Sequence, residues 1–370
     1  MAKIERVEVM MVDLKPKTVR SDAIQSFVSQ ETPIVRITDS DGCVGTGYAY
    51  TIGTGGHSII ALLKNTLAPR LIGKEAEAIE AIWRELFFVT HATTVGAISS
   101  LALATIDTAL WDLRCRRAKQ PLHIMAGGAK TKIPLYNTEC GWLHIEKSQL
   151  VEEALEAKEN GFRASKVKLG SAHISEDRAR LIAVRDAVGD DFEIMTDANQ
   201  GFNASEAIRR ARVLEEVGCA WFEEPIHGDD VGQHVQLARS TSVPIAVGES
   251  LYSISQFKEY FAMGGASIAQ IDVARIGGIT PFLKVAHMAE AFNIPVCPHF
   301  LMELHLGLVC AIPNSVWLEY IPQLDLITND TMRMEDGYAF PSEEAGLGIN
   351  WNWEVINKMR VEGCTLEFSK

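Results

Sequence analysis

The feature that most constrains the fold is a regular series of short apolar runs in the second part of the chain. The series begins after Gly127 and Gly128, and a stretch of helical character follows most of the runs. There are eight runs, at residues 133–138, 165–170, 193–198, 221–225, 245–250, 267–272, 294–299 and 315–320. Parallel neighbours need a crossover helix, so eight strand–helix units predict a closed barrel. We therefore expect an α/β fold with a TIM-type (β/α)8 barrel over residues 126–320.

The stretches between the runs fit the helices of such a barrel. Residues 149–160 and 203–217 are examples, and Asn203 or Ser205 can serve as the N-cap of the second one. Beyond Tyr320 the regularity ends. We expect residues 321–370 to return to the N-terminal part of the chain.

The N-terminal part has a different pattern of apolar and polar residues. Residues 4–13, 33–39 and 43–50 alternate as strands do, and the turn signal of residues 39–42 joins the last two into a hairpin. From about 57 to 118 the pattern is helical, and the small residues of 93–110 allow close packing. These features predict an α+β domain over residues 1–125, to which the C-terminal segment returns.

Charge and composition exclude several classes of function. The formal net charge is −13, which has the wrong sign for a nucleic-acid backbone or an anionic membrane. The chain has no apolar run of 18 residues, and its start lacks the pattern of a signal peptide, so we expect a cytoplasmic protein. The seven cysteines are scattered without a Cys-x-x-Cys pair, which indicates neither a disulfide framework nor a zinc site.

Acidic residues close three consecutive runs. Asp197 ends the third run, and Glu223 and Glu249 follow at intervals of 26 residues, one strand–helix unit each. A single acid at a strand end is more often a helix cap, but three in register converge at the barrel mouth. A hard divalent cation makes such a cluster of negative charge tolerable. The sequence therefore predicts one Mg²⁺ per chain, bound by these three carboxylates.

Two lysines share one face of the second run. Lys166 and Lys168 alternate with Val167, so both point inward or both point to solvent. A solvent-facing pair is common, but the carboxylates favour the inward orientation. Two close ammonium groups depress each other's pKa, which would leave one lysine able to accept a proton. We expect Lys168 to be the base and Lys166 to neutralise a substrate carboxylate.

The last three runs add a second acid–base group. Asp272 closes the sixth run and His299 the seventh, and a carboxylate beside an imidazole fixes its tautomer and raises its basicity. A lone histidine at a strand end is more often structural, so the pairing carries this prediction. Glu319, in the eighth run, can donate a hydrogen bond to developing negative charge if its surroundings keep it protonated.

This constellation resembles the mandelate racemase subgroup of the enolase superfamily over essentially the whole chain. The resemblance rests on Lys166-Val167-Lys168 and on Asp197, Glu223, Glu249, Asp272, His299 and Glu319 in their local motifs. It implies a capping domain that is completed by the C-terminal tail and closed over the barrel. It also implies abstraction of the proton α to a carboxylate, with the resulting enediolate held by Mg²⁺, Lys166 and Glu319.

Within the subgroup, several stretches are similar to acid-sugar dehydratases of the L-talarate/galactarate type. They are residues 135–138, 142–144, 298–305 and 317–319. Those enzymes carry basic residues in the loop that matches residues 50–57, where this sequence has only His57. Arg20 and His57 are therefore the candidates for binding a distal carboxylate. Tyr136, Asn137, Thr138 and Asn199 complete the substrate-binding residues that we predict.

The resemblance implies a dehydratase of an acid sugar that forms a 2-keto-3-deoxy acid. A racemase or epimerase of a 2-hydroxy acid is the alternative, because bases on opposite faces can serve either reaction. A non-catalytic barrel is the third hypothesis, disfavoured because unused buried charges are costly. The expected partners are a small carboxylate and further copies of the chain in a homo-oligomer.

Overall fold

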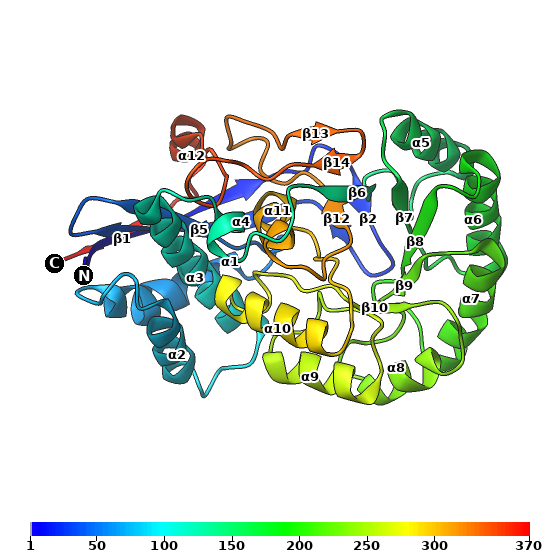
Figure 1. Ribbon diagram of the computed structural model, residues 1–370, viewed down its shortest axis with the longest axis horizontal. Coiled ribbons are helices and arrows are strands. Elements are labelled where there is room, and N and C mark those ends of the chain that lie inside the picture. Colours follow the sequence, from blue (N-terminus) through cyan, green and yellow to red (C-terminus); the bar gives the residue numbers. More distant parts are fainter. Residues whose placement is uncertain (1) are drawn as a thin grey trace.

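The computed structural model describes residues 2–370 and divides into a capping sheet with its helices and a barrel (Figure 1). The capping sheet has the strand order β15-β1-β4-β5. Its strands are β1 (Ile4–Leu14), β4 (Gln30–Asp39), β5 (Val44–Tyr48) and β15 (Leu366–Ser369), and every adjacent pair is antiparallel. The expected N-terminal strands and the hairpin between β4 and β5 are thus present.

Helices cover one face of this sheet. They are α1 (Gly56–Leu62), the π-helical turn η1 (Leu63–Leu67), the 3₁₀ turn η2 (Ala68–Leu71), α2 (Ile79–Val89) and α3 (Ala97–Ala118). Helix α3 lies directly on β5, because a Cβ on Gly47 would stand 2.2 Å from the backbone nitrogen of Ala109. The small residues of this helix and the glycines of β5 therefore allow backbone-to-backbone contact, as the sequence predicts.

The barrel strands follow one another in parallel. They are β6 (Ile133–Asn137), β7 (Ala164–Lys168), β8 (Glu193–Asp197), β9 (Trp221–Glu223), β10 (Ile245–Val247), β11 (Ile268–Ala269) and β12 (Leu318–Tyr320). Strand β12 pairs with β6, and single bridges join Ala269 to Val296 and Val296 to Ser315, which completes the ring.

Helices surround the barrel on its outer side (Figure 1). They are α4 (Leu122–Met125), α5 (Lys147–Glu159), α6 (Ile174–Val188), α7 (Ala204–Val217), α8 (Val231–Ala238), α9 (Ile254–Met263), α10 (Ile279–Ala291) and α11 (Met302–Ala311). Asn203 caps α7 by accepting a hydrogen bond from the backbone of Glu206, as predicted.

The seventh run departs from its prediction. Residues 294–299 form no regular strand, and only Val296 makes ladder bridges to its neighbours. Pro295 and Pro298 flank this position, and proline has no N–H to donate to a sheet. The run therefore occupies the place of a barrel strand without the full hydrogen-bond pattern of one.

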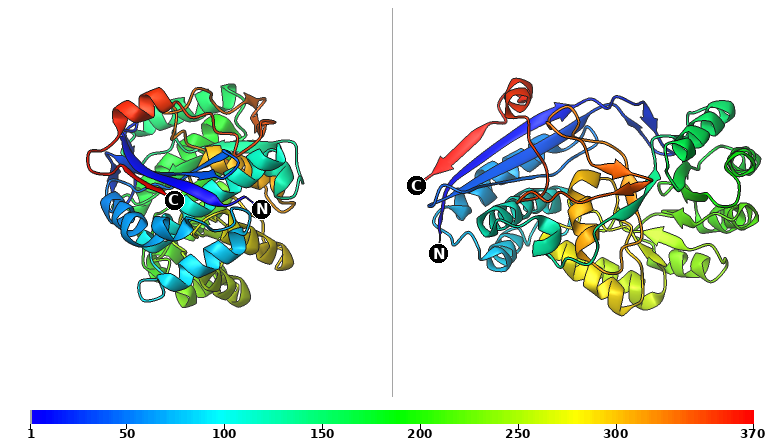
Figure 2. Two further views of the ribbon diagram at one scale, coloured as in Figure 1. Left: turned by 90° about the vertical axis from the view of Figure 1, so that its left-hand side faces the viewer. Right: turned by 45° about the horizontal axis from the view of Figure 1, so that its top comes forward.

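The C-terminal segment contacts both parts of the molecule (Figure 2). Its hairpin of β13 (Met334–Glu335) and β14 (Tyr338–Ala339) pairs with barrel strand β6. Helix α12 (Trp353–Met359) and β15 then return to the capping sheet, where β15 pairs with β1. The tail completes the capping domain as expected, although its first half lies on the barrel. The bounds of the domains at residues 125 and 320 stay a prediction.

A small hairpin extends from the capping domain to the barrel mouth. It consists of β2 (Arg20–Ser21) and β3 (Ser26–Phe27), and the carbonyl of Ser21 accepts a hydrogen bond from the backbone of Leu143 at 3.0 Å. The hairpin thus covers the carboxyl ends of the barrel strands. Among residues 2–370, no helix combines the length and apolar composition that a bilayer crossing requires.

Candidate active site

A cavity at the barrel mouth is lined by both domains. The barrel contributes Lys166, Lys168, Asn199, Glu249, His299 and Glu319. The capping domain contributes Asp22, Ile24, Gln25, Phe27 and Ile52. Polar groups at the ends of barrel strands thus face a largely apolar wall from the capping loops.

Three carboxylates converge beside this cavity. Asp197 ends β8, Glu223 ends β9, and Glu249 lies two residues beyond β10. Each offers one oxygen, and these oxygens lie within 4.8 Å of one another. All three side chains are buried. Buried hard oxygen donors at this spacing fit a divalent cation of the Mg²⁺ type.

The charges of these carboxylates also fit a cation. Burial and the neighbouring Asp197 raise the pKa of Glu223 to about 7. Burial raises the pKa of Asp197 too, but the ammonium groups of Lys168 and Lys166 outweigh this effect and leave the pKa lowered. Glu223 therefore needs added positive charge nearby to stay ionised near neutral pH, which a divalent cation supplies.

The two lysines of β7 point into the barrel. Lys166 Nζ lies 2.9 Å from Glu223 Oε1 and 2.9 Å from Glu319 Oε1. Lys168 Nζ contacts Asp197 Oδ2 and donates to Asn199 Oδ1 at 3.0 Å. The alternation along the strand explains why both share this face.

The expected depression of the lysine pKa values is wrong for these surroundings. Burial lowers the pKa of Lys166, but the Glu223 and Glu319 carboxylates outweigh it, and the net shift is upward. The pKa of Lys168 is raised in the same way, against burial, by Asp197. The nearby carboxylates thus outweigh the repulsion between the two ammonium groups.

Asp272 and His299 form a buried pair. His299 Nδ1 lies 2.9 Å from Asp272 Oδ2, while His299 Nε2 lies 3.1 Å from Glu249 Oε2. Burial raises the pKa of Asp272, but the hydrogen bond and charge of His299 outweigh it, and the net pKa is well below the usual range. Asp272 is therefore an acceptor, which places the Nδ1 proton of the imidazole toward it. The predicted pair thus exists with its ring edge at the cavity.

Glu319 is an acceptor rather than the expected donor. Its Oε1 accepts from Thr138 Oγ1 at 2.6 Å, and its Oε2 accepts from the backbone of Phe300 at 2.7 Å. Burial raises its pKa, but Lys166 outweighs this effect and the net pKa is about 2. The condition that Glu319 stays protonated is therefore not met in this arrangement, because Lys166 lies against it.

Some of the predicted substrate-binding residues line the cavity and others do not. Thr138 and Asn199 line the cavity. Tyr136 lies deeper in the barrel, with its ring edge-on to Trp221 at 5.3 Å between centroids. Asn137 uses its side chain to accept a hydrogen bond from the backbone of Glu139. Only the first two are placed to contact a substrate.

The two predicted cations lie outside the cavity lining. Arg20 pairs with Glu139 and donates to the carbonyl of Pro322 at 2.9 Å. His57 is exposed on α1, and its Nδ1 lies 3.5 Å from the sulfur of Cys364 in the C-terminal segment. The expected binding of a distal carboxylate by these residues therefore has no geometric basis in this structure.

Sequence reasoning missed two residues at the His299 end of the site. Arg275 lines the cavity and contacts Glu249 Oε1 at 3.6 Å, and Tyr50 donates to Asp272. A signal for Arg275 was its position three residues after Asp272, within the same strand-end turn. No local pattern marks Tyr50, because its partner is 222 residues away in the chain.

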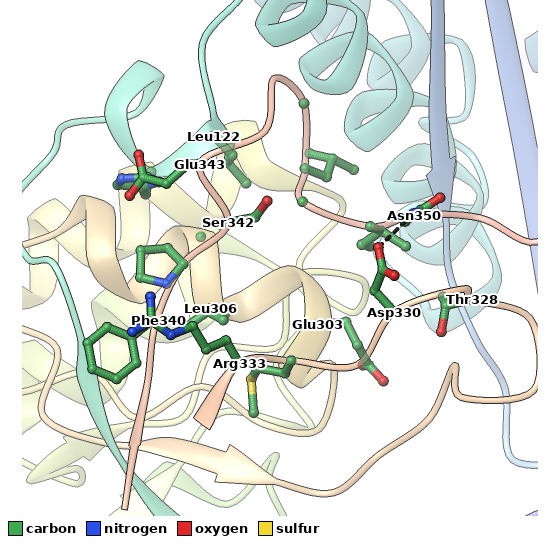
Figure 3. Close-up of a pocket in the computed structure, with 18 of the residues that line it drawn as sticks. Leu122, Glu303, Leu306, Thr328, Asp330, Arg333, Phe340, Ser342, Glu343 and Asn350 are labelled. Carbon is green, nitrogen blue, oxygen red and sulfur yellow. Dashed lines mark hydrogen bonds between the residues drawn. The ribbon is translucent and has the colours of Figure 1, made fainter. Parts of the chain in front are cut away.

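A second cavity lies between α4, α11 and the C-terminal segment (Figure 3). Its lining includes Leu306, Glu303 and Arg333, and on one side of it Asn350 donates to Asp330 at 2.6 Å. The carboxylate cluster, the lysines of β7 and the Asp272–His299 pair do not line it. Acid–base chemistry at a metal therefore belongs to the barrel mouth and not to this cavity.

Comparisons with known proteins agree with this geometry. Residues 6–127 match the family model of the mandelate racemase/muconate lactonizing enzyme N-terminal domain, and residues 149–355 match that of the enolase C-terminal domain-like family. The chain is 34% identical to L-talarate/galactarate dehydratase of Salmonella typhimurium, over all of this chain and 93% of that protein.

Two further relatives are a cycloisomerase and a dehydratase by name. A 3,6-anhydro-alpha-L-galactonate cycloisomerase of Streptomyces coelicolor is 32% identical, covering 97% of this chain and 99% of that protein. Arabinonate dehydratase of Saccharolobus solfataricus is 33% identical, covering 88% and 90%. The Salmonella dehydratase liganded with Mg and L-lyxarohydroxamate superimposes with a TM-score of 0.95 at 33% identity, covering all of this chain and 95% of that one.

Proposed function

Since the chain belongs to the mandelate racemase/muconate lactonizing enzyme family of the enolase superfamily, we propose that it is a Mg²⁺-dependent dehydratase of an acid sugar. The observation that carries the proposal is one cavity lined by both Lys168 and His299, beside a cluster of three buried carboxylates. This arrangement supplies two acid–base groups and a cation site to one small carboxylate substrate.

The cofactor is Mg²⁺, the ion with which the Salmonella dehydratase structure is liganded. Asp197, Glu223 and Glu249 are the residues that would bind it, because they are the buried oxygen donors that lie within 4.8 Å of one another. When bound, the cation stabilises the negative charge that develops on the substrate carboxylate as its α proton leaves.

Lys168, Lys166 and His299 carry out the proton transfers and the charge neutralisation. In its neutral form, which the charge of a cation bound at Asp197 would favour, Lys168 takes the proton α to the carboxylate. Lys166, in its ammonium form, neutralises a carboxylate oxygen. The electron pair of the broken C–H bond forms the enediolate. The C–O bond to the β-hydroxyl then breaks, and the departing hydroxyl takes a proton from His299 and leaves as water. Tautomerisation of the enol gives a 2-keto-3-deoxy acid.

We expect the substrate to be a monocarboxylate, an aldonate rather than an aldarate. The capping wall includes Ile24, Phe27, Ile52 and the neutral Gln25, and no lysine or arginine of the described capping residues lines the cavity. Asp22 lines it as well, and its buried Oδ2 has no hydrogen-bond partner among the described residues. A carboxylate oxygen there repels a second carboxylate but can accept a hydrogen bond from a distal hydroxyl.

A library of aldonates and aldarates with Mg²⁺ tests this function, with 2-keto-3-deoxy products detected by semicarbazide. The proposal predicts a signal that Lys168→Ala abolishes, and a higher kcat/KM for an aldonate than for the corresponding aldarate. Asp22→Asn should narrow that difference in kcat/KM. Asp13→Asn, the same chemical change at an exposed capping residue outside the cavity lining, should leave it unchanged. No product from any member of the library would contradict the proposal.

Racemisation or epimerisation of a 2-hydroxy acid is the second candidate. It is supported by the same pair of groups, because Lys168 and His299 can each exchange a proton with one carbon. Its signature is α-deuterium incorporation from D₂O with inversion and without a keto product.

A further inference from the structure

Tyr50 connects the capping domain to the acid–base pair of the barrel. It lies two residues after the end of β5, and it is only 2% exposed. Its hydroxyl donates to Asp272 Oδ2 at 2.6 Å and lies 3.5 Å from His299 Nδ1. This contact joins residues of the two domains at the carboxylate that orients the imidazole.

With Tyr50 in place, both oxygens of Asp272 are engaged. Oδ1 accepts hydrogen bonds from the backbone N–H groups of Ala274 at 2.8 Å and Arg275 at 3.0 Å. Oδ2 is shared by Tyr50 and His299 Nδ1. The two backbone bonds fix one end of the carboxylate, and the phenol fixes the other end against the imidazole. Loss of the phenol would leave His299 as the only donor to Oδ2 at hydrogen-bond distance among residues 2–370.

Tyr50 is itself held in place. Arg275 Nε donates to its hydroxyl at 3.1 Å, so the phenol has a donor and an acceptor partner. Its ring packs on Phe300 with 4.5 Å between centroids, and Phe300 in turn stacks on the His299 ring at 5.4 Å. Burial raises the pKa of Tyr50 well above its usual value, so the hydroxyl keeps the proton that it donates.

We infer that Tyr50 is a positioning residue for the Asp272–His299 pair, through which the capping domain takes part in proton transfer as well as in substrate choice. The inference rests on the proposed dehydratase function. Positioning matters most when His299 protonates the departing hydroxyl. If the His299 ring is poorly oriented, the α carbon of the enediolate takes a proton back from Lys168, and the β-hydroxyl does not leave.

The test compares Tyr50→Phe with Tyr48→Phe in the full chain with Mg²⁺. Tyr48 is a matched control, because it lies on the same segment, is fully buried, and its hydroxyl has no hydrogen-bond partner among residues 2–370. Reactions in D₂O are followed for keto product and for deuterium at the α carbon of recovered substrate. The ratio of exchange to dehydration measures how often the enediolate returns.

Tyr50→Phe should lower the kcat of dehydration by about 10- to 100-fold. An effect of this size is typical when a supporting hydrogen bond that orients an active-site side chain is removed. KM should change little, and the ratio of exchange to dehydration should rise. Tyr48→Phe should leave both quantities unchanged. An unchanged ratio in Tyr50→Phe, with wild-type dehydration intact, overturns the inference and leaves the proposed function standing.

A thermodynamic cycle tests the contact without any substrate. Urea unfolding of Tyr50→Phe, Asp272→Ala and the double variant should show non-additive losses of stability, because each single change removes the same hydrogen bond. Strict additivity overturns the inference whether or not the protein turns over an acid sugar. Absence of turnover by the wild-type chain refutes only the proposed function.

Discussion

Asp272→Asn is a nearly isosteric change whose effect follows from the hydrogen bonds around the carboxylate. The atom at the Oδ1 position faces two backbone N–H groups, from Ala274 and Arg275, so it must be the amide oxygen. The amide NH₂ then occupies the Oδ2 position beside His299 Nδ1. Two donors cannot face each other, so the neutral imidazole must carry its proton on Nε2.

The imidazolium that donates to the departing β-hydroxyl carries a proton on both ring nitrogens, and in the variant its Nδ1 proton would face the amide NH₂, so the acid form of His299 is disfavoured. Reversal of the tautomer in a comparable carboxylate–imidazole pair lowers turnover by about 10⁴-fold, or about 5 kcal/mol of activation free energy. We expect a loss of this order in the kcat of Asp272→Asn, with near-normal unfolding by urea. The assay is semicarbazide detection of the keto product at saturating substrate. Turnover within tenfold of the wild-type rate would refute this account of His299.

Three further outcomes are expected. Chelation should abolish turnover and added Mg²⁺ should restore it, measured by the same assay; full activity in a metal-free preparation would exclude the carboxylate site. Lys168→Ala should lower kcat by about 10²–10⁴-fold, the contribution of a positioned base, while circular dichroism stays unchanged. Gly47→Ala should destabilise the fold by at least about 2 kcal/mol in urea, because its Cβ would meet backbone of α3 at 2.2 Å. Gly232→Ala, whose Cβ would meet its nearest neighbour at 3.8 Å, should cost nothing.

The barrel and its polar strand ends were predictable because both follow a period. One strand–helix unit separates each of the three acids from the next, and alternation places Lys166 beside Lys168 on the inner face. The seventh strand was only partly predictable. Its apolar run fits the series, whereas Pro295 and Pro298 have no N–H to donate, and only Val296 forms ladder bridges.

The capping loops carry no such period, and the predictions were weakest there. Arg20 and His57 were chosen for their charge, but charge alone does not show that Arg20 is paired with Glu139. The lysine pKa values depend on a sum over carboxylates from several strands, which spacing cannot supply. Tyr50 meets Asp272 only because the capping sheet docks on the barrel.

The most direct test of the account is the mass of the product formed from an aldonate by the Mg²⁺-loaded protein in D₂O. Dehydration predicts a keto acid that has lost one water and gained a single deuterium at the carbon that carried the β-hydroxyl. A product of unchanged composition, apart from deuterium at the α carbon, would contradict dehydration and assign the site to isomerisation.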